Sequence, residues 1–327
     1  MLLDAASPAD IVRAAEWLAA GELVAFPTET VYGLGARADR DEAVAKIFAA
    51  KGRPADHPLI VHVADAAACA PFAAQVPPVA RRLMAAFWPG PLTLILPRTP
   101  GVCSAAAGGE ATIGLRCPAH PGAQALLAAA QRLGVPGVAA PSANRFGRVS
   151  PTRAQHVIDE FGDALPVLDG GACKVGIESS IVDCSRGHPV LLRPGGVSRA
   201  LIEAAAGEPL RAPDAEAPRA PGTLESHYAP DAVLRLMPLP MLRTALQMLG
   251  EPSPGLAVYS RSIALTATPG VRHRRMPARP DQAAHELFAV LREFDAEGVQ
   301  LLWVEDPPPG PEWDGVRDRL QRAAAPR

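Results

Sequence analysis

The chain has 327 residues, of which 48% are hydrophobic and 20% charged, and its formal net charge is −2. This length exceeds one average domain, and the apolar fraction suffices for packed cores, so we expect two globular domains. The near-neutral charge excludes a global basic field for nucleic acid, so any anion site must come from local clusters of cations. No signal peptide is predicted, and the apolar run 87–97 is too short and proline-broken to cross a membrane.

The five cysteines are odd in number and widely spread along the chain. They show no CxxC or cysteine–histidine spacing typical of a zinc site. Unpaired cysteines are typical of a reducing compartment, so we expect a cytoplasmic protein without disulfides. The simplest interpretation is that they are small buried hydrophobic side chains. They are Cys69, Cys103, Cys117, Cys173 and Cys184.

The first two hundred residues alternate between helical and strand patterns. Ser7 and Pro8 predict the start of a helix that Gly21 ends, and Thr152 predicts the cap of a helix that runs to Phe161. Other helices are predicted at 43–50, 79–87 and 122–133, and strands at 23–26, 59–63, 92–96, 112–116, 137–140, 167–168, 180–183 and 190–192. Because the last two strands follow each other directly, we expect an α/β domain with a mixed sheet.

From residue 208 to 219, proline, alanine and charge replace any periodicity, which indicates a linker. The aromatic segment PGTLESHYAP at 221–230 is too specific for a passive spacer. Beyond it, strands are predicted at 233–236, 256–259 and 299–304, and helices at 281–297 and 313–323. This alternation predicts a smaller, Rossmann-like parallel α/β domain, but GxGxxG is absent and no dinucleotide is assigned. The expected organisation is a domain at 1–207, a linker or lid at 208–231, and a domain at 232–327.

Two polar stretches bounded by glycine and proline lie next to apolar runs. They are PTETVYGLG at 27–35 and KGRP at 51–54. Such strand–loop junctions are where α/β folds place ligand sites. Lysine is a compact cation and arginine a planar fork, and both suit phosphate. For the triplet at 51–53 alone, a solvated basic turn is the simpler interpretation.

Other polar residues at strand ends favour a structural role when each is taken alone. Ser142 and Asn144 can satisfy their own loop, and His62 alternates with Val61 and Val63, as a core histidine would. Ser142 has no neighbouring base, and GxSxG is missing, which argues against a serine hydrolase. Collectively, however, buried cations are costly to cluster unless an anion neutralises them. The cations concerned are Lys51, Arg53, Arg116 and Arg193. Together they indicate a binding site for a nucleotide beside a small acid.

Six motifs then occur in order: PTETVYGLG, KGRP with HPLIVHV, WPGPLTLIL, PSANRFGRVSPT, GIESSIVD and LLRPGG. This ordered set resembles the YrdC-like family of L-threonylcarbamoyladenylate synthases, and PGTLESHYAP with the following domain resembles its long, two-domain form. The resemblance implies a YrdC-like twisted mixed sheet with flanking helices. It also implies a reaction of L-threonine, bicarbonate and ATP, the last with Mg²⁺, to threonylcarbamoyl-AMP and pyrophosphate. The product serves the machinery that transfers threonylcarbamoyl to tRNA adenosine next to the anticodon.

The resemblance also assigns residues to the two ends of the site. Thr30, His62, Arg116, Ala140 and Ser179 are implied for threonine. Lys51, Arg53, His57, Thr112, Ser142, Asn144, Ser150, Arg193 and Tyr228 are implied for ATP, with Lys51 and Arg53 as catalytic residues and no protein side chain assigned to metal. His57 stands where the family often has asparagine. Tyr228 is expected to act as a lid, although the lysine–tyrosine pair of one family version is replaced by Leu224 and Glu225.

Two other functions for this fold are weighed against the synthase. An RNA-binding module is weakened by the negative net charge and by the lack of a lysine–arginine run, although tRNA binding stays open. A carbamoyl-transfer module of the hydrogenase-maturation type would be expected to bring zinc-finger and acylphosphatase-like segments, which this sequence lacks.

Overall fold

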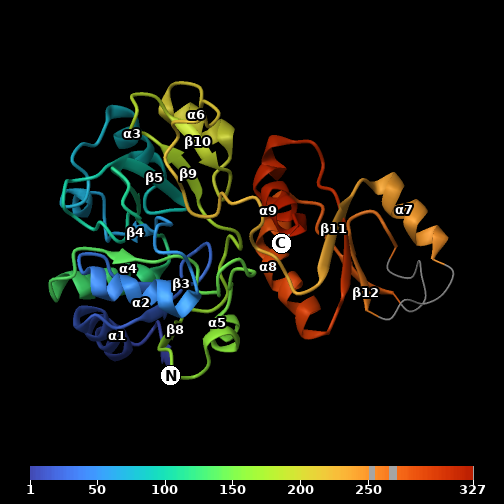
Figure 1. Ribbon diagram of the computed structural model, residues 1–327, viewed down its shortest axis with the longest axis horizontal. Coiled ribbons are helices and arrows are strands. Elements are labelled where there is room, and N and C mark those ends of the chain that lie inside the picture. The colour runs from blue at the N-terminus through green and yellow to red at the C-terminus, as the bar shows by residue number, and fades with distance from the viewer. Residues whose placement is uncertain (250–254, 265–270, 327) are drawn as a thin grey trace. The chain divides into compact units, whose positions relative to one another are not determined.

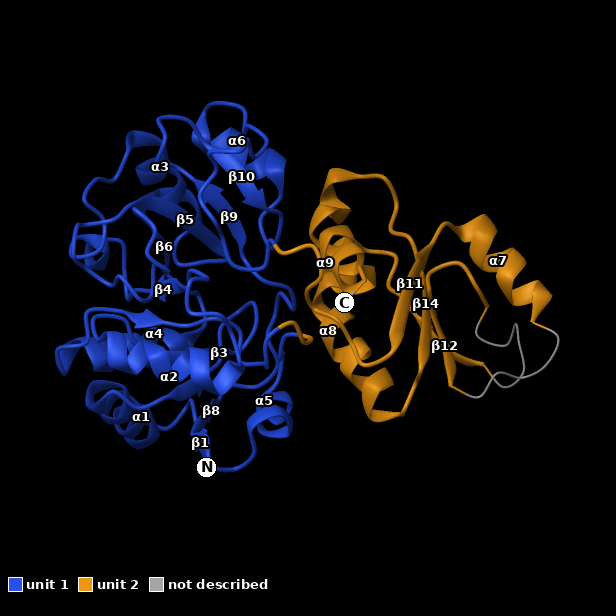
Figure 2. Cartoon of the chain, in the orientation of Figure 1, with its two compact units in different colours: residues 1–146, 150–223 blue, residues 147–149, 224–327 orange. Residues whose placement is uncertain are grey.

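The polypeptide divides between two units, which have different colours in Figure 2. Unit 1 comprises residues 1–146 and 150–223, and unit 2 comprises residues 147–149 and 224–327. The computed structural model describes residues 1–249, 255–264 and 271–326. The division after Thr223 falls inside the predicted linker, whose first part therefore belongs to unit 1.

Unit 1 is built on a ten-stranded mixed sheet with the order β1-β8-β2-β3-β7-β4-β6-β5-β9-β10. The strands are β1 (Leu2–Asp4), β2 (Val24–Phe26), β3 (Gly33–Arg37), β4 (Ile60–His62), β5 (Leu92–Pro97), β6 (Thr112–Arg116), β7 (Val138–Ala139), β8 (Val167–Asp169), β9 (Ser180–Asp183) and β10 (Val190–Arg193). The pairs β4/β6 and β5/β9 are parallel, whereas β5/β6 and β9/β10 are antiparallel. The predicted mixed sheet is confirmed.

Helices flank this sheet. They are α1 (Pro8–Ala20), α2 (Asp41–Lys51), α3 (Pro78–Phe87), α4 (Pro121–Arg132), α5 (Ala154–Phe161) and α6 (Arg199–Ala206), with a short 3-10 turn η1 (Ala67–Cys69). Helix α1 packs on α4 and α3 packs on α6, and Figure 1 shows these two pairs at opposite ends of unit 1. The predicted limits of α1 are confirmed: Ser7 Oγ accepts from Asp10 N at 3.3 Å, and Gly21 adopts a left-handed φ of 85°.

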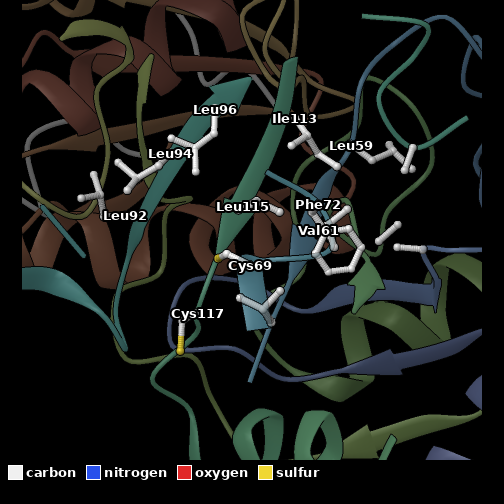
Figure 3. Packing of buried hydrophobic residues seen from close by; sticks show 14 of the residues in the cluster. Leu59, Val61, Cys69, Phe72, Leu92, Leu94, Leu96, Ile113, Leu115 and Cys117 are labelled. Carbon is white, nitrogen blue, oxygen red and sulfur yellow. The ribbon is translucent and has the colours of Figure 1, made fainter. Parts of the chain in front are cut away.

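The main core of unit 1 lies around β4, β5 and β6, as Figure 3 shows. Leu92, Leu94 and Leu96 alternate along β5 and contribute to the same cluster as Leu115 of β6. All five cysteines are buried and free, and Figure 3 shows the sulfur of Cys117 within this core. The interpretation of the cysteines as small buried hydrophobic residues is therefore confirmed.

The helix cap predicted at Thr152 is wrong. Helix α5 begins at Ala154, and Arg153 holds the N-cap position. Thr152 is buried in the preceding loop, where its amide donates to His156 Nδ1 at 3.2 Å and its carbonyl accepts from Cys173 N at 2.9 Å. These bonds fix Thr152 in the loop, so it does not cap the helix.

Some elements lie where the sequence predicts none, namely β1, β3, α6, and, in unit 2, α7 and β13. The stretch predicted as a polar loop at 27–35 is a loop only to residue 32, because β3 begins at Gly33. Glycine is required within β3: a Cβ on Gly35 would lie 2.8 Å from the Phe26 ring and 2.9 Å from Val138. Side chains of the neighbouring strands fill that space.

Unit 2 contains, in its described residues, a parallel four-stranded sheet with the order β11-β14-β12-β13. The strands are β11 (Val233–Met237), β12 (Leu256–Ser260), β13 (Arg272–Arg275) and β14 (Leu301–Glu305), and the helices are α7 (Leu239–Met248), α8 (Pro280–Ala296) and α9 (Asp314–Ala324), with a 3-10 turn η2 (Pro311–Trp313). Figure 1 shows α7 on one side of this sheet and α8 and α9 on the other. The predicted parallel α/β arrangement is confirmed.

A buried carboxylate lies at the carboxyl end of the parallel sheet in unit 2. Glu305, the last residue of β14, accepts hydrogen bonds from Ser260 Oγ, from Arg261 N and Ser262 N at 2.9 Å each, and from the Arg261 guanidinium at 2.6 Å. Burial opposes ionisation, but these hydrogen bonds outweigh it and lower the pKa of Glu305. The loop after β12 is therefore folded around one charge.

The short segment 147–149 belongs to unit 2 although its neighbours in the chain belong to unit 1. Arg148 forms a bidentate ion pair with Asp231, in which Nη1 donates to Oδ1 and Nη2 donates to Oδ2 at 2.7 Å. Ala229 N donates to Gly147 O at 2.9 Å, and the Arg292 guanidinium donates to Val149 O. All three residues of the segment are thus held by unit 2.

Candidate functional site

Strand register brings together the residues assigned to the threonine end of the site. His62 at the end of β4 is the register partner of Arg116 at the end of β6. Ala140 directly follows β7, which pairs with β4, and its amide donates to Ile60 O at 2.9 Å. His62 and Arg116 therefore lie at the ends of two adjacent strands, and Ala140 directly follows the strand next to them.

Arg116 forms a buried ion pair that the sequence did not predict. Its Nη2 donates to Glu29 Oε1 at 2.6 Å, and its Nε donates to Gly90 O at 3.3 Å. The other carboxylate oxygen of Glu29 accepts from Ala119 N at 2.9 Å. Both side chains of the pair are buried, so each charge compensates the other where water is excluded.

Thr30 is fully buried in the loop that precedes β3. Its hydroxyl lies 2.8 Å from that of Thr28, which in turn donates to Val31 O at 2.6 Å and accepts from Val31 N. Thr28 is thus the residue that orders this loop, as serine and threonine hydroxyls do in turns. The loop presents Thr30 next to the Glu29 that pairs with Arg116.

His62 is a buried neutral imidazole. Its Nδ1 has no hydrogen-bond partner among the described residues, and its ring packs edge-on against Phe26 with centroids 5.9 Å apart. Burial, and then the nearby charge of Arg116, lower the pKa of His62 to about 3. A buried ring nitrogen without a partner is costly, and a substrate hydroxyl or amine would satisfy it.

Arg193 and Ser179 form a second polar cluster at the ends of β10 and β9. The Arg193 guanidinium donates to Ser179 O at 2.9 Å and lies 3.3 Å from its Oγ, and Nη1 donates to Pro221 O at 2.8 Å. Ser179 Oγ is also 2.8 Å from Thr93 Oγ1. The turn after Arg193 packs tightly here, since a Cβ on Gly195 would lie 2.3 Å from a main-chain oxygen. This close approach holds Arg193 against Ser179.

Lys51 is buried and tied to the loop that carries Ser142 and Asn144. It ends helix α2, where Gly52 adopts a left-handed φ of 63°. Its ammonium donates to Ser142 O at 2.6 Å and to Asn144 O, and its own carbonyl accepts from Phe146 N at 2.9 Å. Burial, assisted by the charge of Arg53, lowers the pKa of Lys51 well below its usual range. Lys51 therefore fixes the 142–146 loop in place.

Phe146 joins two of the residues assigned to ATP. The Arg53 guanidinium lies 5.7 Å from the centre of its ring, and the His57 ring lies 5.5 Å from it. Arg53 also donates to Pro58 O at 3.0 Å. Burial and the Arg53 charge lower the pKa of His57. Arg53 and His57 thus share one aromatic support on the loop held by Lys51.

The remaining residues assigned to ATP have different surroundings. Ser150 is buried and its hydroxyl donates to the carboxylate of Glu178, the residue before Ser179. Thr112 begins β6 while Arg116 ends it, so along a strand the two lie about 13 Å apart. Thr112 is therefore placed away from Arg116, at the opposite end of β6.

Tyr228 lies in unit 2 and is held there by aromatic and cationic neighbours. It is buried, with a left-handed φ of 61°. Its ring stacks on Phe288 at 5.5 Å, lies 4.1 Å from the His227 ring, and has the Arg319 guanidinium 5.2 Å from its centre. The assignment of Tyr228 to the nucleotide site stays a prediction.

Sequence reasoning missed Glu29, Glu178 and Phe146. Each lies inside a quoted motif, in PTETVYGLG, GIESSIVD and SANRFGRVS respectively. The motifs contain these residues, but clustered cations predict a ligand anion, and nothing in the spacing assigns an internal carboxylate to them. Arg116 and Glu29 are 87 positions apart in the sequence, so the spacing of residues along the chain could not predict that they pair.

Comparison with known proteins places this arrangement in a family. The family model Sua5_yciO_yrdC, described as "Telomere recombination", matches residues 16–195, and the model Sua5_C, described as "Threonylcarbamoyl-AMP synthase, C-terminal domain", matches residues 197–325. The threonylcarbamoyl-AMP synthase of Bacillus subtilis is 39% identical over 97% of this chain and 93% of its own length. That of Pyrococcus abyssi is 38% identical over 95% and 93%.

Solved structures agree with this match. A double-alanine variant of P. abyssi Sua5, with an adjacent histidine and tyrosine replaced, has a TM-score of 0.89 at 34% identity and covers 99% of this chain and 96% of its own. P. abyssi Sua5 complexed with L-threonine has a TM-score of 0.88 at 35% identity, with 99% and 97% covered. The chain therefore belongs to the Sua5/YciO/YrdC family and carries both of its Sua5 domains.

Proposed function

We propose that this chain is a threonylcarbamoyl-AMP synthase, which converts L-threonine, bicarbonate and Mg-ATP to threonylcarbamoyl-AMP and pyrophosphate. The observation that carries the proposal is that relatives of that name match nearly the whole chain. A structure of P. abyssi Sua5 complexed with L-threonine, which covers 99% of this chain, supports it. The buried cations and hydroxyls of unit 1 support it, because they suit a carboxylate and phosphates and include no activated nucleophile.

At the amino-acid end, the guanidinium of Arg116 is the group that suits the threonine carboxylate. The neutral imidazole of His62, with its buried Nδ1, suits a hydroxyl or an amine. Thr30 and Ser179 add hydroxyls, and Ala140 adds an apolar wall. The threonine amine must form an N–C bond to give a carbamate, either with carbon dioxide and release of a proton, or with bicarbonate and release of water.

At the nucleotide end, the reaction needs positioning and charge neutralisation. The carbamate oxygen attacks the α-phosphorus of ATP, a new P–O bond forms, and the bond to the departing pyrophosphate breaks. Arg53 and Arg193 are the cations assigned to the phosphates, while Lys51 holds the loop that carries Ser142 and Asn144. Preorganised cations of this kind stabilise developing charge without moving. The other residues assigned to ATP are His57, Thr112, Ser150 and Tyr228.

The product is a mixed anhydride that water destroys, so a lid over the site would protect it. Tyr228 is the residue proposed for that lid. We further propose that the product passes to a tRNA threonylcarbamoyl transfer machinery in the cytoplasm. None of the described helices combines the length and the apolar character needed to cross a membrane.

The test is pyrophosphate release from Mg-ATP by the full chain, with and without L-threonine and bicarbonate. We expect release only when both are present, together with a product that has the mass of threonylcarbamoyl-AMP. Release that is indifferent to either substrate would contradict the proposal. Retention of tRNA without any pyrophosphate release would instead support an RNA-binding module.

A further inference from the structure

Glu29 is a buried acid in the loop that carries Thr30, and the proposed mechanism gives it no part. Its carboxylate bonds twice to the stretch at the end of β6, with Oε1 on Arg116 Nη2 at 2.6 Å and Oε2 on Ala119 N at 2.9 Å. Its carbonyl accepts from Val175 N at 2.7 Å. Glu29 thus connects the threonine loop, the end of β6 and a third segment at 175.

These contacts fix the plane of the Arg116 guanidinium. Nη2 is held by Glu29 and Nε by Gly90 O, and no hydrogen bond of Nη1 occurs among the described residues. A guanidinium carries five N–H groups in one plane, so three remain when Glu29 and Gly90 O have each accepted one. The fixed plane then sets the direction of any further hydrogen bond. A flexible, unpaired arginine would lose that order, and burial would penalise its charge.

We propose that Glu29 is a positioning residue for the amino acid substrate. It holds Arg116 so that the remaining N–H groups of the guanidinium face the carboxylate of threonine. This inference rests on the proposed function, since it takes Arg116 as the carboxylate ligand. It explains why an acid occupies a loop that is otherwise made of hydroxyl and apolar residues.

A competing interpretation makes the opposite prediction about affinity. If Glu29 merely occupied Arg116 in place of the substrate carboxylate, threonine would have to displace it. Removing the charge of Glu29 would then lower the KM for threonine. If Glu29 positions Arg116, the same change raises the KM for threonine. The sign of the effect therefore separates the two.

The experiment compares Glu29→Gln with the wild-type chain in pyrophosphate release, varying threonine and ATP separately. Glutamine keeps the shape but loses the charge, so we expect the KM for threonine to rise on the order of tenfold, with the KM for ATP within twofold. Glu29→Asp keeps the charge on a shorter stem and should give an intermediate rise. Glu22→Gln is the matched control, because Glu22 pairs with Lys46 at the surface, and it should change neither constant.

An unchanged or lowered KM for threonine in Glu29→Gln would overturn the proposal. So would equal rises for threonine and ATP, because a merely structural defect affects both. If thermal unfolding shows that Glu29→Gln is not folded, Glu29→Asp provides the test: its KM for threonine should rise while its KM for ATP stays within twofold. If the wild-type chain releases no pyrophosphate, the proposed function has failed. Calorimetric titration with L-threonine then tests Glu29 separately, with weaker binding in Glu29→Gln expected and equal or tighter binding overturning it.

Discussion

The ammonium of Lys51 donates a 2.6 Å hydrogen bond to the main-chain oxygen of Ser142, a residue 91 positions further along the chain. A second bond to Asn144 O and a main-chain bond from Phe146 N complete the connection. The family resemblance implies that Lys51 is a catalytic residue that binds ATP. The observed hydrogen bonds of Lys51 hold the 142–146 loop, which carries other residues assigned to ATP.

Replacing Lys51 by methionine should therefore damage both activity and stability. Two main-chain carbonyls, one of them buried, lose their donor, which should lower the free energy of unfolding by about 2 kcal/mol. Pyrophosphate release should fall at least a hundredfold, with a raised KM for ATP. Lys46→Met on the same helix is the control, because Lys46 is half-exposed and pairs with Glu22. Wild-type turnover in Lys51→Met would show that the loop does not need this anchor.

Arg193 should not be replaceable by lysine. Its guanidinium bonds at once to Ser179 and to Pro221 O, and a single ammonium cannot reproduce this planar arrangement. We expect Arg193→Lys to lower turnover at least tenfold and Arg193→Ala to abolish it, while circular dichroism stays unchanged. Arg199→Ala, which removes a more exposed arginine of α6, should leave turnover intact. Full activity in Arg193→Lys would show that charge alone suffices.

His62 should make the fold sensitive to acid. Its pKa is about 3 in the folded chain and about 6.5 when unfolded, so the unfolded state binds the proton first. The contribution of His62 to stability is therefore present above pH 6.5 and is lost as the pH falls toward 3, by ~1 kcal/mol per pH unit. Because the unfolded histidine is already half-protonated at pH 6.5, His62→Gln should lose about 2 kcal/mol less than wild type between pH 6.5 and 4.5 in denaturant titrations. Parallel pH profiles for the two proteins would contradict this account.

Glu305 should matter for the stability of unit 2. Glu305→Gln removes the charge around which the loop after β12 is folded, and it leaves Arg261 with a neutral partner. We expect the free energy of unfolding to fall by about 2 to 3 kcal/mol. Because the pKa of Glu305 is lowered on folding, the wild-type contribution is present above its unfolded pKa and is lost as the pH falls below it. Asp281→Asn, which alters a surface pair with Arg279, should cause no measurable change.

Much of the fold could be predicted because its signals are local. The serine cap and glycine end of α1, and the leucine-rich strand β5, each depend on a few neighbouring residues. Strand β3 could not be predicted, since its two glycines resemble a loop, and the need for Gly35 arises from Phe26 and Val138, which fill the adjacent space. Strand β13, with the sequence RHRR, carries no alternation of polar and apolar residues.

The candidate site could be predicted in its residue types but not in its pairings. The predicted positions of Arg116 and Arg193 at strand ends are confirmed, since they are the last residues of β6 and β10. The partners Glu29 and Ser179 come from other parts of the chain, so their identity depends on sheet order and register. No periodicity in the sequence encodes that order.

The segment 147–149 has a consequence for how this protein can be divided. The chain enters unit 2 twice, first for these three residues and again after Thr223. A cut after Thr223 therefore yields a C-terminal fragment whose Asp231 and Arg292 have lost Arg148 and Val149 O. When C-terminal domains are exchanged between relatives, we expect a folded chimera only if residues 147–149 are exchanged together with residues 224–327. The unit that can be exchanged is therefore encoded by two separate parts of the gene.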